Sequence, residues 1–200
     1  MATSHLAVRP EVSVRETILA AGKHLFHIVG YDAVGVDAIC REAKTTELEF
    51  VVHFGRKEGL LEAIFEDGWY RLLSCLPKAQ TVVSARERIK ELLRLAVEFF
   101  NQDQVFSELF IFEGRRLRDG QMALLTPGYT DFTALLDSLV RIELPEEEAA
   151  VVRSALMGAC EGLVRDLLLR ERFGYPADFS RRQAEQFVSH LVDDLMPHQA

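Results

Sequence analysis

The chain is 200 residues long, 48% of its side chains are hydrophobic, and its formal net charge is −8 at pH 7, with a pI of about 5.3. That apolar content can bury a substantial core in one large domain or two small ones, and six prolines and twelve glycines are too few for a disordered or fibrous protein. The acidic balance excludes nucleic-acid binding through overall positive charge, although an acidic body can still carry a locally basic surface.

The amino terminus and the cysteines indicate a reduced, cytoplasmic protein. The first twelve residues, MATSHLAVRPEV, lack the apolar stretch of a signal peptide, and no apolar run approaches the length that spans a membrane. Cys40, Cys75 and Cys160 are far apart, odd in number and without metal-ligand spacing. We therefore expect packed, reduced thiols and no association with a membrane.

The first third of the chain predicts four helices, over residues 13–29, 36–43, 46–54 and 57–76. Ser13 and Glu16 fit a capping box, in which each side chain accepts a hydrogen bond from the amide of the other residue. Gly30 ends the first helix. Thr46 can cap the third helix, and Pro77 marks the end of the fourth.

After the fourth helix the pattern remains helical and becomes more apolar. It predicts helices over residues 84–100, 104–116, 126–143, 145–172 and 178–195. Ser84 and Glu87 fit a second capping box. Thr126 precedes a proline suited to a first helical turn, and Asp178 can cap the last helix. No segment alternates with a period of two, so we expect no sheet and an all-α protein of about nine helices.

Residues 30–61, which read GYDAVGVDAICREAKTTELEFVVHFGRKEGLL, carry the most informative pattern in the chain. Two short amphipathic helices are joined by a tight turn, and another helix opens at Lys57. That layout is typical of a helix-turn-helix, which places its second short helix in the major groove of DNA.

These residues resemble the TetR family of bacterial one-component regulators. The resemblance is densest from Ile18 to Leu61, where an ILAAGKHLF run, GYDAVGVDAICREA, an HF pair and KEGLL occur in one order and spacing. It implies a helix-turn-helix domain over residues 1–56, a connecting helix over 57–76 and a ligand-binding and dimerisation domain over 77–200. It further implies a homodimer that binds a pseudo-palindromic operator on double-stranded DNA and is released or altered by a small effector.

The resemblance carries three DNA contacts over to this chain. Thr46 matches the Ser or Thr at the start of the reading helix, His53 matches a His before a core Phe, and Lys57 matches a Lys that meets a phosphate. With three further residues of the reading helix, these form the predicted DNA-binding set: Thr46, Glu47, Glu49, Val52, His53 and Lys57.

The reading helix also departs from the family pattern. Two of the departing residues are acidic, three are apolar and one lies in the turn before the helix: Glu47 and Glu49; Leu48, Val51 and Val52; and Lys44. Residues 1–75 contain 8 Lys and Arg against 11 Asp and Glu, a net charge of −3. DNA affinity comes largely from neutralising phosphates, which acidic residues oppose. A glutamate can nevertheless accept from cytosine N4, and a valine can contact a thymine methyl group.

The same departures support an alternative function. An exposed apolar group at Leu48, Val51 and Val52 suggests a protein contact as readily as a DNA contact. Glu47 and Glu49 can also be ordinary solvated charges near a helix amino terminus. The alternative is therefore a TetR-fold protein that has lost specific DNA binding and serves as a protein-interaction module.

Aromatic residues crowd the middle helices of the second half of the chain. An apolar, aromatic interior with a few polar groups is typical of a small-molecule pocket between helices, although aromatics at helical spacing can equally fill a core. The predicted pocket residues are Phe99, Phe106, Phe110, Tyr129, Phe132 and Glu113. We expect a small hydrophobic or aromatic effector and no cofactor.

The last two long helices, from Pro145 to Leu195, predict the dimer interface, because two adjacent long helices exceed what one domain needs. Small residues such as Gly158 and Gly162 would allow the helices to approach closely. The predicted interface residues are Ala155, Ala159, Leu163, Phe187, Leu191 and Leu195. Leu163 can equally belong to the core of one subunit.

No catalytic motif is evident. GxSxG, P-loop, GxGxxG and HExxH patterns are not found in the sequence. His24 and His27 lie three residues apart on the first helix, but no Cys or Asp lies nearby at ligand spacing. We expect neither an enzyme nor a metal site.

Overall fold

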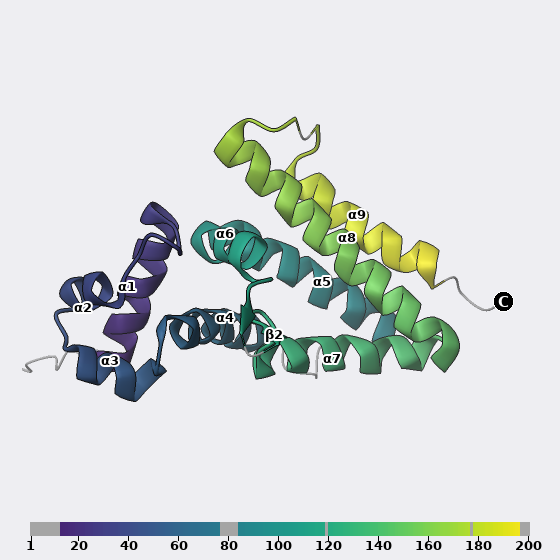
Figure 1. Ribbon diagram of the computed structural model, residues 1–200. Coiled ribbons are helices and arrows are strands. Elements are labelled where there is room, and N and C mark those ends of the chain that lie inside the picture. Colours follow the sequence, from purple (N-terminus) through teal and green to yellow (C-terminus); the bar gives the residue numbers. More distant parts are fainter. Residues whose placement is uncertain (1–12, 77–83, 119, 177, 197–200) are drawn as a thin grey trace, which may run out of the picture. The chain divides into compact units, whose positions relative to one another are not determined.

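The computed structural model describes residues 13–76, 84–118, 120–176 and 178–196. The described residues form nine α-helices and one short β-hairpin, and the chain divides into two compact units, residues 1–61 and 62–200 (Figure 1). The prediction of an all-α protein with about nine helices is confirmed for this part of the chain. The amino-terminal arm and the predicted helix end at Pro77 lie outside the described residues.

The first unit contains the helix-turn-helix. Its elements are α1 (Val14–Val29), α2 (Val36–Ala43), α3 (Glu47–Phe54) and the first residues of α4 (Lys57–Ser74). α1 packs against both α2 and α3. The apolar residues that helical spacing places on one side of each helix meet in a small core, in which Ile18, Phe26, Ile39, Phe50, Phe54 and Leu60 are all buried.

Local sequence determines where the first helix begins and ends. The Ser13 hydroxyl accepts from the Glu16 amide at 3.2 Å, and the Glu16 carboxylate accepts from the Ser13 amide at 2.9 Å, so the predicted capping box is confirmed. Gly30 ends α1 with a φ of 93°, a conformation that residues with a Cβ rarely adopt. The helix therefore stops where the chain must turn toward α2.

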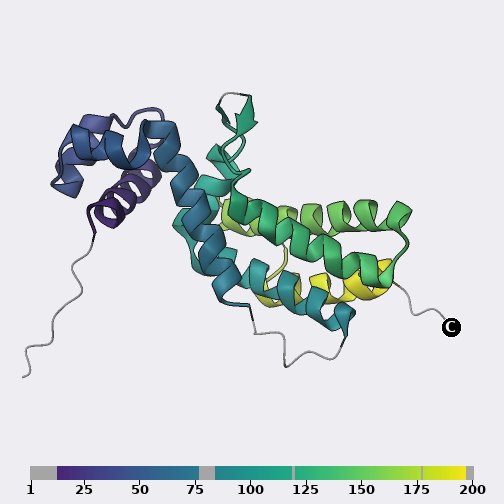
Figure 2. The ribbon, with the colours of Figure 1, turned by 90° about the horizontal axis from the view of Figure 1, so that it is seen from below.

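The second unit contains the rest of α4 and the remaining elements. These are α5 (Ala85–Gln102), α6 (Gln104–Glu113), β1 (Leu117–Arg118), β2 (Gln121–Met122), α7 (Pro127–Glu143), α8 (Glu146–Phe173) and α9 (Arg181–Leu195). α5 is central because it packs against α7, α8 and α9, and α8 and α9 lie side by side (Figures 1 and 2). The antiparallel two-residue strands leave the fold class all-α.

Trp69 on α4 joins the helices of the second unit. Its side chain is buried, and its ring lies 5.2–5.8 Å, centroid to centroid, from the rings of Phe100, Phe110, Tyr129 and Phe132. Those rings come from α5, α6 and α7, and they meet the indole at tilted or edge-on angles, which aromatic pairs prefer. One large side chain thus holds four helices together.

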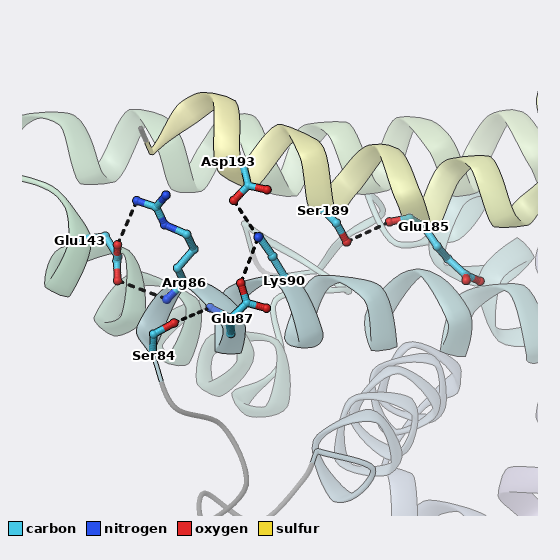
Figure 3. A network of polar contacts seen from close by, with 8 residues as sticks. All are labelled: Ser84, Arg86, Glu87, Lys90, Glu143, Glu185, Ser189 and Asp193. Carbon is cyan, nitrogen blue, oxygen red and sulfur yellow. Dashed lines mark hydrogen bonds and ion pairs between the residues drawn. The ribbon is translucent and has the colours of Figure 1, made fainter. Parts of the chain in front are cut away.

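Polar contacts join the first turns of α5 to its neighbours (Figure 3). Arg86 is buried, and its amide and guanidinium donate to Glu143 on α7 at 3.2 and 3.3 Å. Lys90 Nζ lies 2.7 Å from Asp193 on α9 and 3.0 Å from Glu87. The hydrogen bond with Asp193, above all, raises the pKa of the Lys90 ammonium. Because a buried charge is costly to leave unpaired, Arg86 fixes how α5 and α7 pack.

The second predicted capping box is only half present. Ser84 accepts from the Glu87 amide at 3.2 Å, as expected. The Glu87 carboxylate, however, accepts from Lys90 at 3.0 Å, because the ammonium is a stronger donor than an amide. At the start of α7 the prediction is confirmed: Thr126 caps the helix, and Pro127 is its first residue.

Two predicted helix boundaries were wrong, the start of α9 and the end of α6. α9 is capped by Ser180, whose hydroxyl accepts from the Gln183 amide at 3.3 Å, and Asp178 lies too far before the helix to reach that amide. The helix predicted over residues 104–116 ends at Glu113 instead, because the chain turns at Gly114 into the hairpin.

Candidate functional site

The turn between α2 and α3 is made without glycine. Lys44 adopts the left-handed conformation, with φ 54° and ψ 44°, and its amide donates to the Arg41 carbonyl at 3.3 Å. The Thr45 amide donates to the Cys40 carbonyl at 3.0 Å, which satisfies the end of α2. A left-handed residue that carries a Cβ costs about 1–2 kcal/mol. The packing on both sides of the turn therefore holds a strained residue, whose side chain is exposed directly before α3.

Thr46 and Glu49 cap α3 by binding each other. The Thr46 hydroxyl accepts from the Glu49 amide at 3.2 Å. The Glu49 carboxylate accepts from the Thr45 hydroxyl at 2.6 Å, from the Thr46 hydroxyl at 2.8 Å and from the Thr46 amide at 2.9 Å. These hydrogen bonds, that from Thr45 above all, lower the pKa of Glu49 to about 2. The cap predicted at Thr46 is confirmed, and the sequence did not reveal that Thr45 joins it.

Lys57 is bound inside the first unit. Its ammonium donates to the carbonyls of Tyr31 and Val34, at 2.9 Å each, and lies 4.4 Å from the centroid of the Tyr31 ring. Tyr31 is itself buried, with its ring 4.9 Å from that of Phe26. Lys57 thus fastens the loop after α1 to the start of α4. An ammonium has three donors, so these two bonds leave one for a phosphate, and the predicted phosphate contact stays a prediction.

Four exposed residues on α3 form what we call the reading face: Glu47, Leu48, Val51 and Val52. At 100° per residue they cover about 140° of the helix circumference, opposite to the buried Phe50. Leu48 and Val52 are each 73% exposed and Val51 is 54% exposed. Three of the four side chains are apolar. His53 is also exposed, but helical spacing places it on the flank of α3 beside Glu49.

Exposed cations lie on either side of the reading face along the chain. Lys44 precedes α3 and Arg56 follows it, while Arg15 on α1 lies 5.4 Å from the centroid of the Phe54 ring. Residues 13–61 contain six Lys and Arg against seven Asp and Glu, a net charge of −1. The described first unit is therefore nearly balanced, with cations beside an apolar and acidic helix.

The second unit contains a cavity of about 480 Å³ between α4, α5, α6, α7 and α8. Its aromatic walls are Trp69, Phe100, Phe110, Tyr129 and Phe132, and its polar lining includes Arg115, Thr133, Arg153, Ser154 and Glu161. Trp69 Nε1 is buried and has no hydrogen-bond partner among the described residues. Arg115 pairs with Glu161, and Arg153 lies 3.8 Å from Asp137. The cavity is thus mostly apolar, with polar groups contributed chiefly by α8.

Three of the predicted pocket residues, Phe110, Tyr129 and Phe132, line this cavity. The other three do not. Phe106 is fully buried in the core, and Phe99 lies under the Arg71 guanidinium, 5.3 Å from it. Glu113 pairs with Arg116. Arg153 and Glu161 also line the cavity and were not among the predicted residues, although their eight-residue spacing places both on one face of α8.

Residues 18–64 match the family model described as bacterial regulatory proteins, tetR family. This part of the chain therefore carries the amino-terminal domain of the TetR family. Members of the family are DNA-binding transcription regulators and not enzymes, as the sequence analysis expected. A comparison with proteins of curated function finds no match to this chain.

Solved structures of several proteins named as regulators share the fold along nearly the whole chain. The fatty acid degradation regulator FadR from Bacillus halodurans is 16% identical, with a TM-score of 0.76 and coverage of 96% of this chain and 100% of that one. A putative transcriptional regulator from Pseudomonas aeruginosa PAO1 is 21% identical, with a TM-score of 0.73 and coverage of 91% and 89%. A putative TetR-family regulator from Syntrophomonas wolfei is 16% identical, with a TM-score of 0.72 and coverage of 94% and 96%.

The predicted dimer residues lie on partly exposed faces of α8 and α9. Leu156, Val164 and Val188 of these helices are buried within the unit. Ala155 and Phe187 are exposed, and Ala159, Leu163, Leu191 and Leu195 are half-buried. The predicted row therefore retains apolar surface that packing within one subunit does not cover.

The remaining sequence features carry no further site. His24 Nδ1 lies 2.5 Å from Glu42 Oε1, a contact between α1 and α2. The described residues contain no group of three or more His, Cys, Asp or Glu arranged to hold a metal ion. Within the same residues, no helix combines the length and the apolar character needed to cross a membrane.

The Thr45 hydroxyl should control the titration of Glu49. In Thr45→Val, the pKa of the Glu49 carboxyl should rise from about 2 toward 4.5, its ordinary value, because the strongest hydrogen bond to the carboxylate is lost. Since the folded-state pKa lies below the unfolded value, Glu49 stabilises the fold above about pH 4.5, and this contribution disappears as the pH falls toward 2. Carbon-13 NMR of the glutamate carboxyls measures the midpoint.

Thr17→Val is the matched control for this titration. Its hydroxyl donates to the Ser13 carbonyl at 3.0 Å and contacts no carboxylate, so the Glu49 midpoint should not move. An unchanged midpoint in Thr45→Val would contradict the assigned cause.

Proposed function

We propose that this chain is a ligand-responsive transcription regulator, which binds a pseudo-palindromic operator as a homodimer through α3. A small, mainly apolar effector in the cavity of the second unit changes that binding. The observation that carries the proposal is the construction of α3: a short helix capped by Thr46 and Glu49, anchored by Phe50 and Phe54, with one face left to solvent. This is the arrangement with which a helix-turn-helix reads DNA.

The charges around α3 support separate roles for its neighbouring cations, which would contact phosphates, and for its reading face, which would contact bases. Phosphate contacts position a protein on the duplex, and contacts to base edges specify the sequence. Lys44, Arg56 and the unused donor of Lys57 can serve the phosphates, while the reading face meets the bases. The Glu49 carboxylate accepts three hydrogen bonds within the protein, which hold its charge at the amino terminus of α3, where the helix dipole favours an anion. Glu47 then remains as the acidic group on the reading face.

Operator binding should depend on the reading face and not on exposed apolar residues elsewhere. Purified protein should enrich a palindromic sequence from fragmented genomic DNA at physiological salt. Val52→Glu should weaken binding to that sequence by about tenfold to a hundredfold, the range for loss of one good base contact. Val52 is 73% exposed, so the substitution should leave the unfolding temperature unchanged.

Ile142→Glu provides the matched control, because Ile142 is 71% exposed and lies on α7. It should bind the operator as the unaltered protein does. Failure of the unaltered protein to enrich any sequence would overturn DNA recognition and leave the protein-interaction function as the better explanation of the reading face.

The cavity supports a small effector with an apolar body and one hydrogen-bond acceptor. Its volume, about 480 Å³, is that of a pocket for a small organic molecule, and its walls are largely aromatic. The buried Trp69 indole N–H is a donor whose hydrogen bond an effector can supply. Two of the similar structures are named as regulators of fatty acid degradation or metabolism, which makes fatty acids suitable first probes.

α4 provides a route from the cavity to the helix-turn-helix. It is continuous from Lys57 to Ser74, and it contributes Lys57 to the first unit and Trp69 to the cavity wall. An effector that packs against Trp69 can therefore favour one position of α4. It shifts the equilibrium only by the difference in its affinity for the two states.

Filling the cavity should block effector binding. Thr133 lines the cavity, and Thr133→Phe should weaken binding at least about tenfold, because the added ring occupies the effector volume. Trp69 is the single tryptophan, so its fluorescence reports titration with medium-chain fatty acids and naphthalene derivatives. Thr130→Phe, one turn earlier on α7 and outside the cavity lining, should bind like the unaltered protein. Equal affinity of both variants would place the effector elsewhere.

The dimer should form through the exposed row on α8 and α9. Phe187 is 50% exposed and is the most exposed of the three predicted residues of α9. Phe187→Glu should give a monomer in sedimentation equilibrium, because a carboxylate would lie against an apolar partner surface. Leu117→Glu alters a residue that is 71% exposed in the hairpin and should remain dimeric. A dimeric Phe187→Glu protein would exclude this surface.

A further inference from the structure

We propose that this regulator recognises its operator mainly through pyrimidines: the methyl groups of thymine, with one carboxylate contact to cytosine. The inference rests on the proposed function, because it concerns how the same helix reads DNA. It identifies Leu48, Val51 and Val52 as the residues that determine specificity.

The reading face offers no hydrogen-bond donor from its side chains. Leu48, Val51 and Val52 present only C–H groups, and Glu47 when ionised only accepts. All four side chains are exposed, and the three apolar ones are at least half accessible to solvent. A groove placed against this face would therefore meet methyl groups and one carboxylate.

The two threonine hydroxyls beside the reading face, and two of the three hydrogens of the Lys57 ammonium, are committed to contacts within the protein. The hydroxyls of Thr45 and Thr46 donate to the Glu49 carboxylate, at 2.6 and 2.8 Å. The Lys57 ammonium donates two of its three hydrogens to backbone carbonyls. His53 lies on the flank of α3, away from the reading face. Thus the capping that holds α3 also removes both threonine hydroxyls from base recognition.

Base-edge chemistry then restricts what the reading face can recognise. In the major groove adenine and guanine present N7, and guanine also O6, as acceptors that need a donor from the protein, while adenine also presents its N6 amine as a donor. Thymine presents a methyl group, which an apolar side chain contacts, and cytosine presents an amine, which a carboxylate accepts from. The three aliphatic residues therefore match thymine. Glu47 matches an amine edge, and cytosine N4 is the usual partner of a carboxylate there.

The surroundings of the face favour DNA over a protein as the occupant. The apolar patch consists of three side chains and lies on the second helix of a helix-turn-helix. The exposed cations Lys44 and Arg56 lie three residues before the start and two residues after the end of α3. Cations at these positions suit phosphates on either side of a groove.

Modified operators test the inference on the full-length protein. In the first, each thymine of one half-site is replaced in turn by deoxyuridine, which lacks only the methyl group. Affinity should fall about fourfold for each contacted methyl, the effect of returning one such group to water. In the second, purines are replaced by 7-deazapurines, which lack the N7 acceptor, and affinity should change less than about twofold.

A protein variant tests which side chain contacts a given thymine methyl group. At one position of the half-site, Val52→Ala should bind the operator with thymine and the operator with deoxyuridine with equal affinity. The reason is that the side chain that contacts the thymine methyl group there has been shortened. Ile142→Ala should retain the full difference. Melting temperatures of both variants should match the unaltered protein, since both residues are exposed.

The outcomes separate this inference from the proposed function. Specific binding that is insensitive to deoxyuridine but weakened by 7-deazapurines would overturn pyrimidine reading and leave operator binding intact. Absence of any enriched sequence would overturn both, and would indicate that the reading face contacts a protein. Loss of affinity with deoxyuridine that persists unchanged in Leu48→Ala, Val51→Ala and Val52→Ala would overturn the assignment to these residues.

Discussion

The reading helix depends on the hydrogen bonds between Thr46 and Glu49. α3 has only eight residues, and an isolated helix of that length is not stable in water. The reciprocal cap satisfies amides at its first turn, and Phe50 and Phe54 anchor its inner side in the core. Thr45 adds a third residue to the cap and keeps the Glu49 carboxylate ionised. Without this arrangement the exposed face of α3 would have no defined shape to present to DNA.

The same contacts explain how an acidic helix can belong to a DNA-binding family. Glu49, which looks in the sequence like a charge aimed at DNA, is a structural acceptor of three hydrogen bonds. Lys57, which looks like a phosphate ligand, is largely engaged in tying the loop at Tyr31 to α4. Polar groups that stabilise the unit are thereby engaged within the protein, and the reading face of α3 is apolar with one glutamate. The proposed recognition through methyl groups rests on that engagement.

The second unit combines a tightly packed centre with a cavity beside it. Trp69 contacts rings from three other helices and also forms part of the cavity wall, so an effector would touch the side chain that holds the unit together. The contacts of Arg86 and Lys90 with α7 and α9 brace the amino-terminal end of α5 (Figure 3). Rigid helices around a cavity are suited to transmitting a small displacement, because packed interiors do not deform continuously.

The sequence by itself determined the helices, most of their caps and the helix-turn-helix, because capping boxes, helical periodicity and glycine or proline breaks act over a few residues. It also placed three of the six predicted pocket residues in the cavity wall. Tertiary structure alone decided the rest. Phe106 and Phe110 are one turn apart on α6, yet only Phe110 reaches the cavity, because Phe106 packs beside Gly68 in the core. Likewise, the carbonyls of Val34 and Tyr31 that accept from Lys57 lie 23 and 26 positions earlier in the chain. Such contacts depend on which helices meet and at what rotation, and no local pattern encodes that.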